Sequence, residues 1–134
     1  MFATLSAQDQ ATVRTAAYGA VSLLAAADAK PHKAATAGSL ALLTATGPVG
    51  HVLAAKAKDI TLSGKNVAEL ADRVLPALTA AVTLLQQRDP AEAEDFRSTV
   101  LVAVEAATTT PGPVTGEMTR KIAAALHGNA QRSR

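Results

Sequence analysis

The sequence contains no cysteine and no tryptophan, and aromatic residues make up only 2% of its 134 residues. Without cysteine there are no disulfides, thiolate metal sites or cysteine nucleophiles. This composition suits a reducing compartment, and we expect a cytoplasmic protein. Hydrophobic residues are 49% of the chain, so the core must be built mostly from Ala, Leu and Val. Such a core depends on close approach between Ala-lined helices rather than on large side chains.

Charge is also scarce, because charged residues are 18% of the chain and the net charge is only +2. Nucleic-acid binding is not indicated, since the basic residues form no long stripe and no aromatics are interleaved with them. The longest apolar runs, 16–27 and 74–85, are shorter than the about 18–20 residues that span a bilayer. The leading segment MFATLSAQDQ has no basic residue and carries Asp9, which disfavours a signal peptide. We expect neither a membrane span nor secretion.

No recognisable pattern of catalytic, cofactor-binding or metal-ligating residues is present. The histidines have no HxH, HxxxH or HExxH spacing, and the glycines form no phosphate-binding loop. The acidic residues of segment 89–95 are better explained as charges that complement the start of a helix than as a cation site. The sequence therefore predicts a protein that is not an enzyme, with no catalytic residue, no cofactor and no metal site assigned.

Helical signals dominate the chain. Ser6 and Asp9 have capping-box spacing, and Asp89-Pro90 combines an N-cap acid with proline at the first helical position. Pro76 falls inside a periodic segment and is expected to kink or split that helix near Leu75. Thr115 is expected to cap the last helix. The expected helices are 7–29, 31–45, 49–57, 66–87, 90–107 and 116–126.

The run TVLVAV, residues 99–104, is also compatible with a buried strand, because periodicity cannot separate strand from helix over a short apolar run. The upstream cap favours helix, and no partner strands are apparent elsewhere. The fold class predicted is all-α, a single-domain bundle of six to seven helices over residues 1–128. Residues 129–134 are expected to form a frayed basic tail.

One feature occurs twice: an apolar helix, a polar turn with proline, and a second helix. The first copy is AVSLLAAA, DAKPHK and AATAGSLALL, and the second is TVLVAVEA, ATTTPGPVTGE and MTRKIAAALHG. Many all-α proteins contain such helical hairpins. Internal duplication would give a bundle with approximate two-fold symmetry.

The segments RTAAYGAVSLLAAADAKPHKAATAGSLALL and PAEAEDFRSTVLVAVEAATTTPGPVTGEMTRKIAAALHG resemble the two half-repeats of TerB-like tellurite-resistance proteins. The resemblance covers about residues 13–128. It implies an all-helical fold whose acidic turns, one in each half, bind metal cations.

The sequence departs from that pattern in both turns. Asp28 keeps the family's aspartate, but Ala29 replaces the usual glycine, and Lys33 and Ala34 stand where acids are expected. In the second turn Thr108 takes the aspartate's place and TTPGP, residues 109–113, replaces the acidic stretch; only Glu117 offers a carboxylate nearby. Because a Ca²⁺ site needs six or more oxygen ligands, we expect impaired metal binding and turns held in shape by proline stiffness.

The function expected from this resemblance is that of a non-enzymatic TerB-like module in stress response or tellurite resistance, acting through an unidentified protein partner. The alternatives are a divalent-cation sensor that uses Asp28, Glu117 and backbone carbonyls, and a small-molecule-binding helical bundle. Self-association through Ala-rich faces, giving a homo-oligomer, is compatible with the first.

Overall fold

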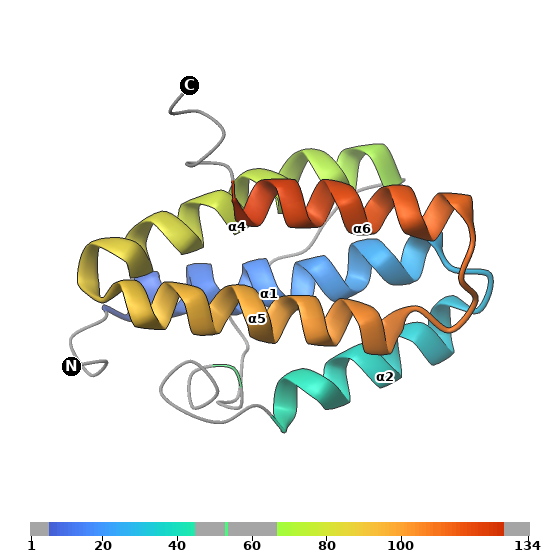
Figure 1. The fold of residues 1–134 in the computed structure, drawn as a ribbon, viewed down its shortest axis with the longest axis horizontal. Helices are drawn as coiled ribbons and strands as arrows, with labels where there is room; N and C mark the ends of the chain where they lie inside the picture. The colour runs from blue at the N-terminus through green and yellow to red at the C-terminus, as the bar shows by residue number, and fades with distance from the viewer. Residues whose placement is uncertain (1–5, 45–52, 54–66, 128–134) are drawn as a thin grey trace.

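The computed structural model describes residues 6–44, 53 and 67–127, and these form five helices with no strand. The helices are α1 (Ala7–Ala27), α2 (Pro31–Leu43), α4 (Val67–Arg88), α5 (Pro90–Ala107) and α6 (Pro113–Leu126), arranged as a bundle (Figure 1). The all-α prediction is confirmed for these residues. The strand alternative is wrong, because residues 99–104 lie inside α5.

The capping signals behave as predicted. The backbone N–H of Asp9 donates to Ser6 Oγ at 3.0 Å at the start of α1, and the N–H of Ala91 donates to Asp89 Oδ1 at 3.0 Å at the start of α5. Pro31 and Pro90 both lie at the beginning of their helices, where a missing N–H costs no helical hydrogen bond. These local rules fix where three of the helices begin.

The prediction of six to seven helices is wrong for the described residues, which contain five. Of the kink or split expected at Pro76, the split does not occur, because α4 runs unbroken across this residue. Pro76 and Asp72, whose carbonyl loses its N–H partner there, are both exposed, so water can replace the lost bond. The expected helix 49–57 and the tail 129–134 lie outside the described residues, except for Leu53. Leu53 is buried, and its carbonyl accepts a 2.8 Å hydrogen bond from the Tyr18 hydroxyl.

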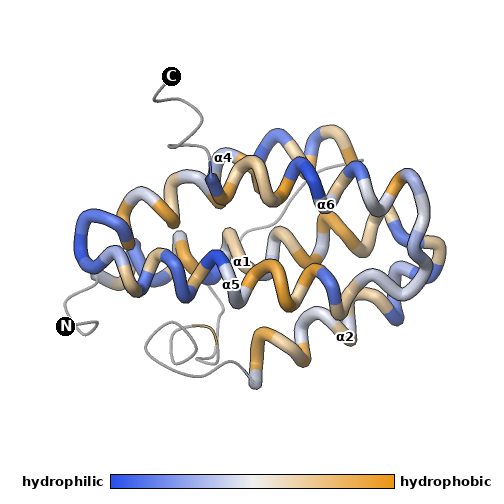
Figure 2. The backbone as a smooth tube through the Cα atoms, in the orientation of Figure 1, coloured by the Kyte–Doolittle hydropathy of each residue, from blue (hydrophilic) through white to orange (hydrophobic). Residues whose placement is uncertain are grey.

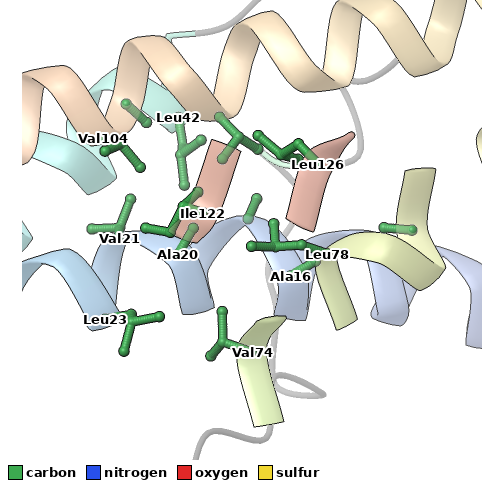
Figure 3. Close-up of a cluster of buried hydrophobic side chains, with 14 of the residues drawn as sticks. Ala16, Ala20, Val21, Leu23, Leu42, Val74, Leu78, Val104, Ile122 and Leu126 are labelled. Carbon is green, nitrogen blue, oxygen red and sulfur yellow. The ribbon is translucent and has the colours of Figure 1, made fainter. Parts of the chain in front are cut away.

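Helix α1 lies at the centre of the bundle and contacts all four of the other helices. Its buried residues occupy nearly every side of the helix, as expected for a helix surrounded by protein. Ala16, Ala20 and Val21 meet side chains of α2, α4, α5 and α6 in the core (Figure 3). The outer helices instead alternate between hydrophobic and hydrophilic positions (Figure 2). In the described residues, no helix is both long and apolar enough to cross a membrane.

Close helix approach, predicted from the alanine-rich composition, is clearest at Gly38 of α2. A Cβ built at Gly38 would lie 2.7 Å from Val21 Cγ1 of α1 and 3.0 Å from Ala107 Cβ of α5. Real Cβ atoms are essentially never closer than 3.0 Å to another heavy atom. Three helices therefore meet at a point where only a residue without a side chain fits.

Candidate functional site

The turn between α1 and α2 and the turn between α5 and α6 lie together at one end of the bundle (Figure 1). We call residues 28–30 and 108–112 the turn junction. These are the two turns that the sequence singles out. They are about eighty residues apart in the chain, and donors of the second turn converge on the Asp28 carboxylate of the first.

The Asp28 carboxylate is buried and accepts four hydrogen bonds. Oδ1 accepts from the backbone N–H of Lys30 at 2.8 Å and from the Thr109 hydroxyl at 2.7 Å. Oδ2 accepts from the backbone N–H groups of Thr109 and Thr110, each at 3.0 Å. Only 5% of the Asp28 surface is exposed, so these donors replace the water that a carboxylate otherwise requires.

These hydrogen bonds stabilise the charged form of the carboxylate. The N–H of Lys30 makes the largest contribution, and the hydroxyl and N–H groups of the second turn add to it. They lower the pKa of Asp28 from 3.8 to about 2, although burial acts in the opposite direction. Asp28 is therefore an anion at any physiological pH, held by donors from both turns.

A carboxylate offers about four lone-pair positions, and Asp28 has four donors around it. A cation at this carboxylate would have to displace N–H groups that point at the same oxygens. Among the described residues no three His, Asp or Glu side chains come together in a group that could hold a metal ion. The turn junction is thus chemically a hydrogen-bonded clasp between two hairpins.

The second turn is ordered by its own hydroxyl groups. The Thr108 hydroxyl donates to the Val104 carbonyl at 2.9 Å, which closes the last turn of α5. Thr115 is buried, and its Oγ1 accepts from the N–H of Gly112 at 3.1 Å. The prediction that Thr115 is the N-cap of the last helix is therefore wrong. Gly112 takes that position, and Thr115 reaches back to it from the third position of a helix that begins at Pro113.

Other residues that the sequence placed at the two turns take no part in the hydrogen bonds to Asp28. Glu117 is exposed and ion-paired with Arg120 along α6. Lys33 is exposed on the first turn of α2, while Ala34 is buried. The carboxylate that the sequence offered as a partner for Asp28 is therefore engaged elsewhere.

The histidines and the acidic segment occupy ordinary structural positions. His32 is exposed near the start of α2, and His127 Nδ1 lies 3.0 Å from the Ala123 carbonyl at the end of α6. His51 lies outside the described residues. In the acidic segment, Glu94 is paired with Arg97 at 2.6 Å, and this hydrogen bond lowers the pKa of Glu94.

Shallow grooves mark two parts of the surface. Two adjoining grooves of about 410 and 570 Å³ follow α2 and the end of α1, and they share His32 and Ala35 as lining residues. Leu40 and Leu43 line the 410 Å³ groove near the C-terminal end of α2, and they are 59% and 50% exposed. A third groove, of about 470 Å³, lies between α5 and α6, where Leu101, Glu105 and Pro111 contribute to its lining.

The role of Asp28 as an acceptor for two turns was missed by the sequence reasoning, which treated it as a weak metal ligand. One local signal was available, because an aspartate that follows a helix commonly accepts from the N–H two residues on. The donors from Thr109 and Thr110 had no such signal. They come from a segment 81 and 82 residues away.

No family model matches the chain, and comparison with curated proteins and with solved structures likewise finds no match. The function must therefore be inferred from the residues and their geometry.

Proposed function

We propose that this chain is a non-enzymatic, TerB-like helical module that acts in the cytoplasm by binding a protein partner, in a stress-response or tellurite-resistance setting. Its two hairpins, α1–α2 and α5–α6, would descend from one duplicated unit. The turn junction would be a degenerate ion site in which hydrogen bonds have replaced the ion.

The observation that carries this proposal is the set of donors around Asp28. A Ca²⁺ site supplies six to eight oxygen ligands, several of them charged. The turn junction has a single buried carboxylate, and backbone N–H groups occupy both of its oxygens. N–H donors at these positions repel a cation. Their hydrogen bonds to Asp28 link the two turns without a bound ion.

Partner binding is supported by the surface of α2. Large apolar side chains that are half exposed or more, here Leu40 and Leu43, are expected where another protein packs. The first turn of the same helix carries Lys33 and His32, and α2 contains no acidic residue. A partner with an apolar segment next to acidic residues fits this surface best.

Two substitutions test the proposed surface. Leu40→Lys and Leu43→Lys are expected to abolish capture of the native partner from cell extract, while the melting temperature stays within a few degrees of wild type. Val102→Lys on α5 is the matched control, because Val102 is 59% exposed, as is Leu40. Equal capture by all three variants would remove α2 from the proposal.

Ion titration tests the degenerate site separately. Calorimetry with Ca²⁺, Mg²⁺ and Mn²⁺ is expected to give no binding heat, and about 1 mM of each ion is expected to leave the melting temperature unchanged. Stoichiometric heat that disappears in Asp28→Asn would instead establish a divalent-cation sensor.

A small-molecule-binding bundle is the second candidate, favoured by the groove between α5 and α6. Its lining combines apolar side chains with the Glu105 carboxylate and the hydroxyls of Thr108 and Thr119. A fragment screen followed by NMR distinguishes this candidate, since bound fragments would shift the amides of Leu101 and Thr119 and leave those of Leu40 and Leu43 unchanged.

A further inference from the structure

The second turn exposes one threonine that is followed directly by proline. Thr110 precedes Pro111, and this is the only Thr-Pro or Ser-Pro pair in the 134 residues. Residues 110–114 are all exposed. Gly112 has fully extended backbone angles, φ 179° and ψ −176°. An exposed hydroxyl directly before proline is the dipeptide that proline-directed protein kinases recognise.

Thr110 is also part of the turn junction. Its backbone N–H donates to Asp28 Oδ2 at 3.0 Å. Its hydroxyl oxygen lies 3.4 Å from that of Thr109, and the Thr109 hydroxyl donates to Asp28 Oδ1 at 2.7 Å. Because the Thr109 proton is directed at the carboxylate, the Thr109 oxygen is free to accept from Thr110. The Thr110 oxygen is thus two hydrogen bonds from a buried anion.

We propose that Thr110 is a phosphorylation site for a proline-directed serine/threonine kinase, and that its phosphorylation opens the turn junction. The kinase transfers the γ-phosphoryl group of ATP to Thr110 Oγ1. A P–O bond to the threonine forms as the P–O bond to ADP breaks, and the hydroxyl proton passes to the kinase's base and then to solvent. This inference does not depend on the proposed partner or on the origin of the hairpins.

The consequence for the clasp is electrostatic. A phosphothreonine carries a charge of about −1.5 to −2 at neutral pH and has lost its hydroxyl donor. It would lie beside the Asp28 carboxylate, which stays ionised because its pKa is about 2. Like charges at this separation repel each other, so the bonds from Thr109 and Thr110 to Asp28 weaken.

The first test uses the full chain, Mg²⁺-ATP and an activated mitogen-activated protein kinase that phosphorylates a standard substrate in parallel. Mass spectrometry is expected to find one phosphate, located on Thr110. Thr110→Ala and Pro111→Ala should each lose it, whereas Thr36→Ala on α2 should retain it. No phosphate on the folded chain, or phosphate at another residue, would overturn the assignment.

The second test measures the effect on the clasp. Phosphorylation is expected to lower the melting temperature by about 3–6 °C. Thr110→Glu should melt below Thr110→Gln, and the gap should close in an Asp28→Asn background. Should Asp28→Asn fail to fold, the same gap should shrink between low salt and 1 M NaCl, where charges are screened. An unchanged melting temperature on phosphorylation, or equal Glu and Gln variants, would show that phosphate at Thr110 does not open the junction.

Discussion

The two hairpins of this protein have the same outline but are built differently. In the first, α1 and α2 pack directly along each other, and Gly38 lets their backbones approach closely. In the second, α5 and α6 touch little, and α6 packs instead against α4 and α1. A groove opens between α5 and α6 as a result. A repeated sequence outline therefore does not imply repeated packing.

The two turns also differ, and their hydrogen-bonding groups are complementary. The first turn supplies the carboxylate, and the second turn supplies three of the four donors that bind it. Polar groups of the two turns therefore bond one another. The hairpin with closely packed helices contributes the charge and one donor, and the hairpin with the open groove contributes the other three donors.

The largest expected effect comes from the centre of the first hairpin. Leu24→Ala in α1 removes a side chain with no exposed surface, and we expect a loss of about 2–5 kcal/mol in the free energy of unfolding. Urea denaturation measures it. Val114→Ala on α6, where Val114 is 63% exposed, is the control and should stay within about 0.5 kcal/mol of wild type. Similar losses in both would mean that α1 is not the central helix.

The next largest effects are expected from replacing one glycine in each hairpin by alanine. Gly38→Ala places a methyl group 2.7 Å from Val21 Cγ1, and the resulting displacement should cost about 1–3 kcal/mol despite the better helix propensity of alanine. Gly116→Ala in α6 meets no atom within 4 Å and should stabilise the fold by about 0.5–1 kcal/mol. Thermal melts of the two variants should shift in opposite directions. Stabilisation by both would contradict the close contact at Gly38.

Thr115→Val tests the hydroxyl that orders the second turn. Valine preserves the shape but leaves the N–H of Gly112 without its acceptor, and the expected loss is about 1–2 kcal/mol. Thr36→Val in the first hairpin is the matched control, because the Thr36 hydroxyl donates only to the His32 carbonyl at an exposed position. Its effect should be within about 0.5 kcal/mol. Urea denaturation of both variants gives the comparison.

The smallest expected effect is the pH dependence of the Asp28 contribution, because this contribution changes only in acid. The pKa of Asp28 is lowered in the folded state, so the unfolded chain binds the proton first. The stabilisation from Asp28 is complete above about pH 4 and is lost as the pH falls through about 2. The difference in melting temperature between wild type and Asp28→Asn should be constant at pH 5–7 and shrink below pH 4. A difference that is independent of pH would show that the carboxylate is not held as an anion.

Local chemistry made much of the fold predictable. Caps such as Ser6 and Asp89 act on their own neighbours, so their effect can be inferred from a few residues. The start of α6 was misplaced because Thr115 was given the capping role, although Pro113 is a strong marker of a first helical position. The helix over 66–87 was predicted, but whether Pro76 would split it could not be decided from the local sequence, since this depends on which side of the helix faces solvent.

The candidate site was predicted in location but not in chemistry. The sequence singled out both turns, yet the donors of Thr109 and Thr110 are brought to Asp28 only by the packing of α1, α2 and α5. A carboxylate beside hydroxyls is equally compatible with an ion site and with a hydrogen-bonded clasp. The direction of the neighbouring backbone groups decides between them: N–H groups that point at the carboxylate give a clasp, and carbonyl lone pairs give an ion site. This direction is a property of the folded backbone.

The clasp also bears on the order in which the chain folds. Its bonds between Asp28 and Thr109 close a loop of 81 residues, and the entropy of closing so long a loop must be compensated by other contacts first. Docking of α4 and α5 onto α1 brings the two turns together, and we infer from this that the clasp forms late, on the native side of the folding barrier. Thr109→Val should then leave the refolding rate unchanged and accelerate unfolding, which makes Asp28 a determinant of how long the folded state persists.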